Sequence, residues 1–169
     1  EAYAQAETTF GGVNILVNAA GISPGDTIEN ASLEHWHKVH AICLDGVFLG
    51  CNHGVPLIDQ SGGGSIINIG TLGTTALQAK NSQYTSTKLA MVAMSKTMAR
   101  EMGRQNVRVN IVTPGFTTGE GLTVLFENMG KSAGISGEAM SEKVAETTEL
   151  KRHVDPEDIA EACLYLGSD

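Results

Sequence analysis

Short runs of apolar and β-branched residues alternate along this chain with longer segments in which apolar residues recur at helical spacing. The short runs predict three buried strands, at residues 13–18, 65–69 and 108–112. The longer segments predict helices over residues 2–10, from Leu33 past Cys43, over 83–102 and from Pro156 onward. Strands separated by helices predict a parallel sheet with crossover helices, so the predicted fold class is α/β.

Residues with strong positional preferences mark the ends of these helices. Gly11 and Gly103 are placed to end the first and third helices. Ser32 can cap the second helix, and Asp155 followed by Pro156 signals the start of the last one. The apolar stripe of the second helix consists of Leu33, Trp36, Val39, Ile42 and Cys43.

Ligands of parallel sheets bind beyond the carboxyl ends of the strands, so the residues that follow each strand are candidates for chemistry. Here they are Asn18-Ala19-Ala20-Gly21, Gly70-Thr71 and Thr113-Pro114-Gly115. Tyr84 and Lys88 begin the helix that follows the second strand, and they can reach the same rim.

Tyr84 and Lys88 are the most informative pair in the chain because they stand four residues apart on a predicted helix and share one face. An unperturbed tyrosine has a pKa of about 10, which is too high for a base at neutral pH. A neighbouring ammonium favours the phenolate, so we expect Lys88 to lower the pKa of Tyr84. The pair is therefore a candidate proton-transfer device.

Composition excludes several classes of function. The net charge of −8, the pI near 5.0 and the lack of a Lys/Arg run argue against nucleic acid. The apolar runs are too short to predict a membrane span. Cys43, Cys51 and Cys163 form no C-x-x-C pattern, which predicts reduced thiols in the cytoplasm. We expect the histidines at 35, 37 and 40 to lie on a partly solvated helix side and no metal site to form there.

In order and spacing, these pieces resemble the short-chain dehydrogenase/reductase family in its compact single-domain branch, over essentially the whole chain. The matching stretches are Leu16–Gly21, Trp36–Phe48, Gly64–Thr71, Tyr84–Lys88 and Arg108–Gly115. The resemblance implies a Rossmann-like doubly wound sheet and an oxidoreductase that uses NAD or NADP to interconvert an alcohol and a ketone.

The resemblance also implies residue roles. Tyr84 would be the general acid/base, Lys88 would lower its pKa and bind the nicotinamide ribose, and Thr71 would orient the substrate. The residues that would lie along the cofactor are Asn18, Ala19, Ala20, Gly21, Ile69, Tyr84, Lys88, Pro114, Gly115 and Thr117. Thr117 and Thr118 both remain candidates for holding the carboxamide.

Cys43 departs from the family pattern because it stands where the resemblance places a catalytic asparagine. A thiol is a poor hydrogen-bonding group, so we expect any relay through this position to be weakened or rerouted. Asp45 lies nearby in sequence as a possible substitute. The other interpretation is that Cys43 is simply a small core residue.

The chain lacks the glycine-rich phosphate turn with which a dinucleotide fold starts, and with it the residue that would choose NAD over NADP. By resemblance, residues 1–169 form a single partial domain that holds the fourth to sixth of seven strands, truncated at both ends. The strand at residues 13–18 would then present an unpaired apolar edge, and we expect the segment alone to be marginally stable or to associate.

Several alternatives stay open. The chain could be an inactive remnant that acts only by association, or, less favoured, an epimerase or dehydratase of the extended branch. Apolar residues between Leu122 and Met140 could form a mobile lid over a small uncharged substrate or pack on the sheet. The Met91, Met94 and Met98 stripe could serve a dimer or tetramer interface, as the resemblance implies, or the core.

Overall fold

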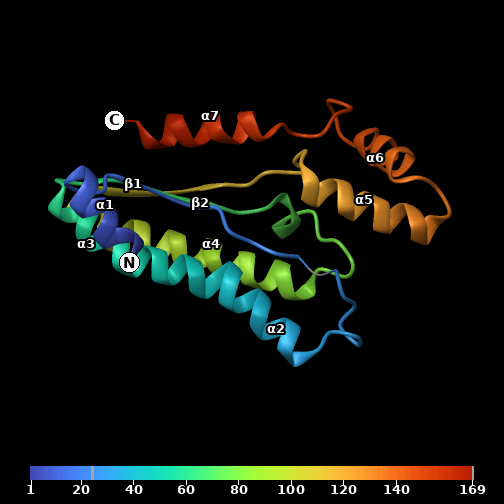
Figure 1. The fold of residues 1–169 in the computed structure, drawn as a ribbon, viewed down its shortest axis with the longest axis horizontal. Coiled ribbons are helices and arrows are strands. Elements are labelled where there is room, and N and C mark those ends of the chain that lie inside the picture. Colours follow the sequence, from blue (N-terminus) through green and yellow to red (C-terminus); the bar gives the residue numbers. More distant parts are fainter. Residues whose placement is uncertain (24, 169) are drawn as a thin grey trace. The chain divides into compact units, whose positions relative to one another are not determined.

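The computed structural model describes residues 1–23 and 25–168, and it contains the three predicted strands in one parallel sheet (Figure 1). The strands are β1 (Ile15–Asn18), β2 (Gly64–Ile69) and β3 (Val107–Val112). Their order is β1-β2-β3, with Ile15 opposite Ser65 and Gly64 opposite Val107. The parallel α/β fold is therefore confirmed.

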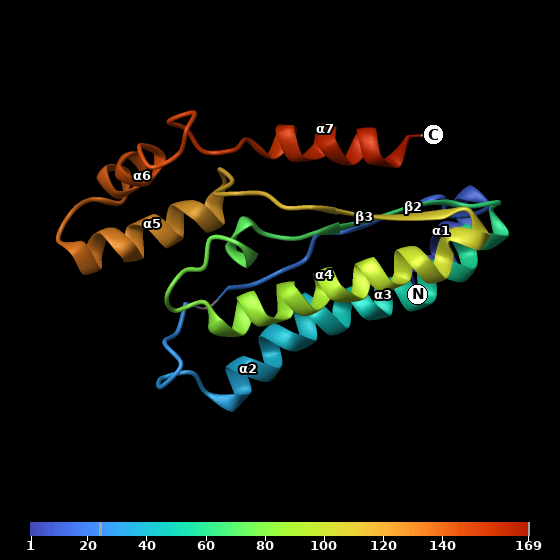
Figure 2. The same cartoon turned by 180° about the vertical axis from the view of Figure 1, so that it is seen from behind.

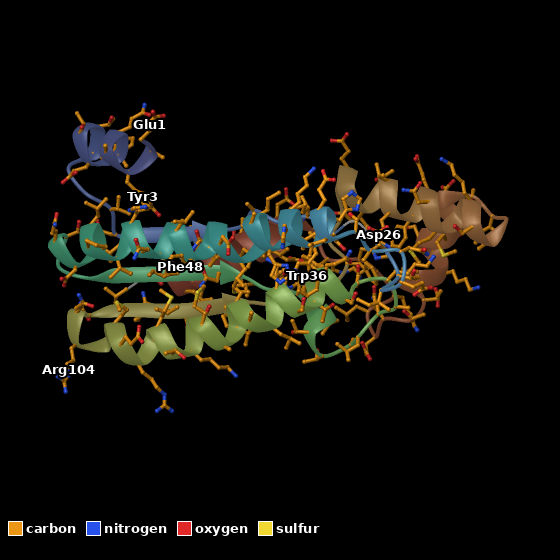
Figure 3. The ribbon with its side chains drawn as sticks, turned by 90° about the horizontal axis from the view of Figure 1, so that it is seen from below. Glu1, Tyr3, Asp26, Trp36, Phe48 and Arg104 are labelled. Carbon is orange, nitrogen blue, oxygen red and sulfur yellow. The ribbon has the colours of Figure 1, made fainter. Side chains whose placement is uncertain are left out.

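Four helices accompany the sheet in the first part of the chain. They are α1 (Ala2–Phe10), α2 (Leu33–His40), α3 (Gly46–Gln60) and α4 (Ser82–Met102). Helices α3 and α4 run side by side along one face of the sheet, as Figures 2 and 3 show. The predicted stops and caps are confirmed, since Gly11 ends α1 with a φ of 81° and the Ser32 hydroxyl accepts a hydrogen bond from the His35 N–H.

A π-helical turn, Ala41–Asp45, joins α2 to α3. Such a turn has i→i+5 hydrogen bonds, so the side chains before and after it do not keep the spacing of a regular α-helix. Only part of the predicted stripe is buried: Val39 and Cys43 are covered, whereas Leu33 is 68% exposed. The span Leu33–Gln60 is long and apolar enough to cross a bilayer by length and composition, but its Val47, Cys51 and Ile58 side chains lie in the protein core.

The core lies between the sheet and the two helices α3 and α4. Its buried members are Val47, Cys51, Ile58, Ile66, Met91 and Val107. Met94, Met98 and Met102 pack partly against this cluster, so the methionine stripe of α4 contributes to the core.

By contacts the chain divides into two compact units, the first comprising Glu1–Thr113 together with the residues from Cys163, the second comprising Pro114–Ala162. The expectation of a single partial domain stays a prediction. The second unit contains α5 (Glu120–Ala133), α6 (Gly137–Ala145) and the beginning of α7 (Pro156–Gly167). The predicted start of α7 is confirmed, whereas α5 and α6 were not predicted.

An aromatic cluster organises the second unit. Phe126 is buried and its ring lies 5.1 Å from that of His153, and Phe116 is 5.7 Å from Phe126. The His153 Nε2 atom is 2.9 Å from the Ser141 hydroxyl. Val124, Leu125 and Met129 on α5 remain exposed. The apolar residues of this segment therefore divide between a local core and the surface of their own unit.

The C-terminal turn of α7 belongs to the first unit and is fastened to the sheet. Arg108 of β3 donates to the Leu166 and Ser168 carbonyls, each at 2.7 Å, and the Ser65 hydroxyl of β2 donates to the same Leu166 carbonyl at 2.7 Å. A cation at the carbonyl end of a helix also complements the helix dipole. These bonds fix the last turn of α7 over β2 and β3.

Candidate active site

Tyr84 and Lys88 lie in the first two turns of α4, and their side chains share one face of the helix as predicted. The Lys88 Nζ atom is 5.7 Å from the centre of the Tyr84 ring. Tyr84 is half-buried, whereas Lys88 is only 2% exposed. The helix therefore brings a phenol and a buried amine together beside the carboxyl end of β2.

The Lys88 amine is held by the backbone of β2. Its Nζ atom donates to the Ile69 carbonyl at 2.7 Å, which places it at the end of the strand. A Cβ atom added to Gly21 would stand 3.7 Å from Nζ and 3.8 Å from the Cys43 sulfur. The amine thus lies between the end of β2 and the turn that follows β1.

The predicted direction of the Tyr84 pKa shift was wrong. Burial raises the pKa of Tyr84 above its ordinary value of 10.0, and a hydrogen bond with the Thr71 side chain lowers it only in part. Burial likewise lowers the pKa of Lys88 below 10.5. The reason is that removing both groups from water disfavours their charged forms, and this outweighs the attraction that the sequence suggested.

Thr71 follows the end of β2 and lies beside Tyr84. Its hydroxyl accepts a hydrogen bond from the Gly73 N–H at 3.1 Å, which starts the 3-10 turn Leu72–Thr74. The same side chain lies close enough to Tyr84 to lower the pKa of its phenol in part. Thr71, Tyr84 and Lys88 therefore form one cluster from two elements.

Cys43 lies in the π turn and is fully buried. Its sulfur accepts from the Ile22 N–H at 3.3 Å, and the thiol donates to the Ile22 carbonyl at 3.4 Å. The thiol thus ties the loop after β1 to the helix beside Lys88. Asp45 is exposed at the end of the same turn. Sequence reasoning missed both Ile22, which contributes only backbone atoms, and the π turn, which has no periodic signal.

The turn after β1 combines an inward amide with small exposed residues. The Asn18 amide donates to the Asn68 side chain at 2.8 Å, and Asn68 donates to the Ser95 hydroxyl at 2.8 Å. Ala19, Ala20 and Gly21 are exposed. The Asn18 side chain therefore forms hydrogen bonds inside the protein. The three small residues leave their backbone open to a flat ligand.

Pro114, Gly115 and Thr117 lie in the second unit. The Thr117 hydroxyl donates to the Gly115 carbonyl at 3.3 Å, and Thr117 forms a parallel bridge with Val154. The neighbouring Thr118 hydroxyl donates to an Asp155 carboxylate oxygen at 3.3 Å. Both threonine hydroxyls thus have partners within their own unit, and the predicted carboxamide contact stays a prediction.

Two other features lie apart from this cluster. A hollow of about 460 Å³ is lined by Ser95, Lys96, Ala99, Arg100, Val109, Asn110 and Ile111, beside the free edge of β3. On the surface of α2, His35 is 3.1 Å from Asp26, and over residues 1–23 and 25–168 no group of His, Cys, Asp or Glu side chains could hold a metal.

Comparison with known proteins identifies the family. The family model described as "Enoyl-(Acyl carrier protein) reductase" matches residues 1–169. A 3alpha-hydroxysteroid dehydrogenase of Mediterraneibacter gnavus is 33% identical over 165 residues, which is 98% of this chain and 62% of that protein. The 2,5-dichloro-2,5-cyclohexadiene-1,4-diol dehydrogenase LinX of Sphingobium indicum is 35% identical over 99% of this chain and 63% of its own length.

Solved structures agree with these relatives. L-sorbose reductase of Gluconobacter frateurii, in complex with NADPH and L-sorbose, superposes with a TM-score of 0.92 and 28% identity over 99% of this chain and 64% of that one. The chain thus spans a little over three fifths of the length of the relatives it matches. From its sequence match and its fold, the chain belongs to the short-chain dehydrogenase/reductase family.

Proposed function

We propose that the protein is an NAD(P)-dependent oxidoreductase that interconverts a secondary alcohol and a ketone, with Tyr84 as the general acid/base. The observation that carries this proposal is the cluster of Thr71, Tyr84 and Lys88 at the carboxyl end of β2. Family membership and relatives named as dehydrogenases and reductases support it.

The residues of the first unit fit a dinucleotide. The exposed Ala19, Ala20 and Gly21 can lie along the cofactor, while the Lys88 amine, which already holds the Ile69 carbonyl, has further N–H groups for a ribose hydroxyl. Pro114, Gly115 and Thr117 would complete the nicotinamide side. When bound, the cofactor supplies or accepts the hydride at the carbon that carries the oxygen.

In this proposal Tyr84 transfers the proton and Thr71 positions the substrate oxygen. In the reduction direction the Tyr84 phenol donates its proton to the carbonyl oxygen, and in the oxidation direction the phenolate accepts it from the alcohol. The Thr71 hydroxyl holds the same oxygen beside the phenol. Because burial raises the Tyr84 pKa, the phenolate needs a compensating positive charge, and the Lys88 ammonium is the group placed to give it.

Replacing Tyr84 by phenylalanine tests the assignment. In the complete protein, Tyr84→Phe should lower kcat for ketone reduction by about a hundredfold or more, because it removes the proton donor and little volume. Tyr165→Phe is the matched control, since Tyr165 is 79% exposed on α7 and should leave kcat unchanged. Unchanged turnover in Tyr84→Phe would refute the role.

The choice between an enzyme and an inactive remnant needs a binding measurement. Calorimetric titration of the complete protein with NADH and NADPH should give micromolar binding of at least one, and the ratio of the two affinities identifies the preferred cofactor. Absence of binding by both would favour the remnant.

We further propose a cytoplasmic homo-oligomer, a dimer or tetramer. The exposed apolar side chains of Phe48, Leu49 and Leu89 on α3 and α4 support association.

A further inference from the structure

Asn81 stands at the start of α4, three residues before Tyr84, but its side chain does not cap the helix. Asparagine is among the residues best suited to an N-cap, where its side-chain oxygen accepts from an N–H of the first turn. Ser32 and Ser136 make this bond at α2 and α6, and their backbones are extended, with ψ of 152° and 158°. Asn81 has a ψ of 17°, and in the described part of the chain its side chain caps no N–H of α4. The amide is thus available for a contact outside its own helix.

This contact joins α4 to the loop that follows β1 (residues 19–23). The Ser23 hydroxyl donates to the Asn81 Oδ1 atom at 2.8 Å, although the two residues are 58 positions apart in the sequence. Figures 1 and 2 show the loop passing the start of α4. The Asn81 carbonyl in turn accepts from the Thr85 N–H at 2.8 Å, in the first turn of the helix. One residue therefore links the loop directly to the turn that carries Tyr84.

A second contact holds the neighbouring residue of the same loop. Both backbone groups of Ile22 bond to the Cys43 thiol in the π turn, so two successive loop residues are tied to two different elements. Directly before them, a Cβ atom added to Gly21 would stand 3.7 Å from the Lys88 Nζ atom. The loop thus runs beside the amine, and a displacement of the loop changes the spacing between the exposed Ala19–Gly21 turn and Lys88.

We propose that Ser23 and Asn81 are positioning residues. Their hydrogen bond holds the Ala19–Gly21 turn at a fixed distance from Tyr84 and Lys88. This role rests on the oxidoreductase function proposed above, in which that turn lies along the cofactor. A loop that is already ordered binds its ligand more tightly, because binding does not have to order it. The observation that carries the proposal is that Asn81 bonds this loop in place of capping its own helix.

Removing the Ser23 hydroxyl separates positioning from stability. In Ser23→Ala of the complete protein, Asn81 can cap its own helix instead, so Tm should stay within about 1 °C of the wild-type value. Calorimetry should show the Kd of NADH or NADPH, whichever binds more tightly, rising about three- to tenfold, because binding must then order the loop. Hydrogen exchange at the Ile22 N–H should become faster as well. Ser132→Ala is the matched control and should change none of these quantities, since the Ser132 hydroxyl is exposed and bonds the Asn128 carbonyl within its own helix.

A double-mutant cycle tests whether the two residues act through their bond. Asn81→Ala should raise the Kd by a similar factor, and the double variant should bind the dinucleotide no more weakly than the weaker-binding single variant. Ser23→Thr keeps the hydroxyl and should recover most of the affinity. If the effects of the two alanine substitutions on Kd multiply, or if Ser23→Ala binds as wild type does, the positioning role is refuted. If the wild-type protein binds neither dinucleotide, the oxidoreductase proposal itself fails, and the positioning role fails with it.

Discussion

At the scale of single residues, burial decides the chemistry of the candidate site more than proximity does. The i, i+4 spacing correctly predicted that Tyr84 and Lys88 meet, and the structure places them 5.7 Å apart by ring centre and amine. Sequence spacing carries no measure of desolvation, however, and for that reason it predicted the wrong direction for the Tyr84 pKa.

The lowered pKa of Lys88 predicts how stability depends on pH. Between that lowered value and the ordinary 10.5, the unfolded chain holds the Lys88 proton more fully than the folded protein does. The free energy of unfolding should therefore rise with pH across this window, and the contribution is smallest below it. Lys88→Met has no amine to titrate, so the stability difference between wild type and variant should grow in favour of wild type as pH increases.

Urea unfolding of both proteins between about pH 7 and pH 10 measures this difference. Tyr84 is present in both proteins, so the effect of its raised pKa on the free energy of unfolding largely cancels in the difference. A difference that is flat or that shrinks with pH would show that Lys88 is not desolvated in the folded state.

Cys43 gives a second prediction at this scale. Cys43→Ala removes two weak hydrogen bonds to Ile22 and leaves a small cavity, so it should lower the free energy of unfolding by about 1–2 kcal/mol. Cys43→Ser keeps a donor and an acceptor and should recover part of this loss. Cys163→Ala is the control, at a half-buried cysteine whose thiol has no hydrogen bond to residues 1–23 or 25–168. Equal stability of the alanine variant and wild type would contradict the anchoring role.

At the scale of elements, local signals predicted some parts of the fold and missed others for physical reasons. Ser32, Gly11 and Pro156 act through their own backbone geometry, so the ends that they mark were predictable. The π turn at Ala41–Asp45 depends on tertiary contacts such as the bond from Cys43 to Ile22, which no local pattern records. Glycines at 119, 121, 130, 134 and 137 obscured α5 and α6, although Ser136 does cap α6 by accepting from the Ala139 N–H.

The fastening of α7 to the sheet depends on the forked guanidinium of Arg108. Arg108→Ala should lower the free energy of unfolding by about 1 kcal/mol, since two charge-assisted bonds are lost from an exposed side chain. Arg108→Lys should be intermediate because an ammonium cannot reproduce the fork. Hydrogen exchange in the last turn of α7 reports the local effect. Arg104→Ala should leave it unchanged, because Arg104 is exposed and its side chain bonds no other residue in the described part of the chain. If hydrogen exchange in the last turn of α7 is the same in Arg108→Ala as in wild type, Arg108 does not hold this turn on the sheet.

At the scale of the whole molecule, the sheet ends at β1 on one side and β3 on the other. On β1, Ile15 is 51% exposed and Val17 is 45% exposed, so an apolar face accompanies the unpaired backbone of this edge strand. Such an edge can pair with another chain. The expectation of an exposed apolar edge at residues 13–18 is thus met within the described residues.

We therefore predict that a polypeptide of residues 1–169 associates through β1. Val17→Lys should shift it toward monomer, because a lysine on the edge strand opposes pairing by charge repulsion and desolvation. Val124→Lys is the matched control: Val124 is 50% exposed on α5, where the backbone groups are already bonded within the helix, so association should continue. Sedimentation of the three proteins at equal concentration separates the cases. If both lysine variants dissociate equally, general charge rather than the strand edge governs association; if neither does, the contact lies elsewhere on the surface.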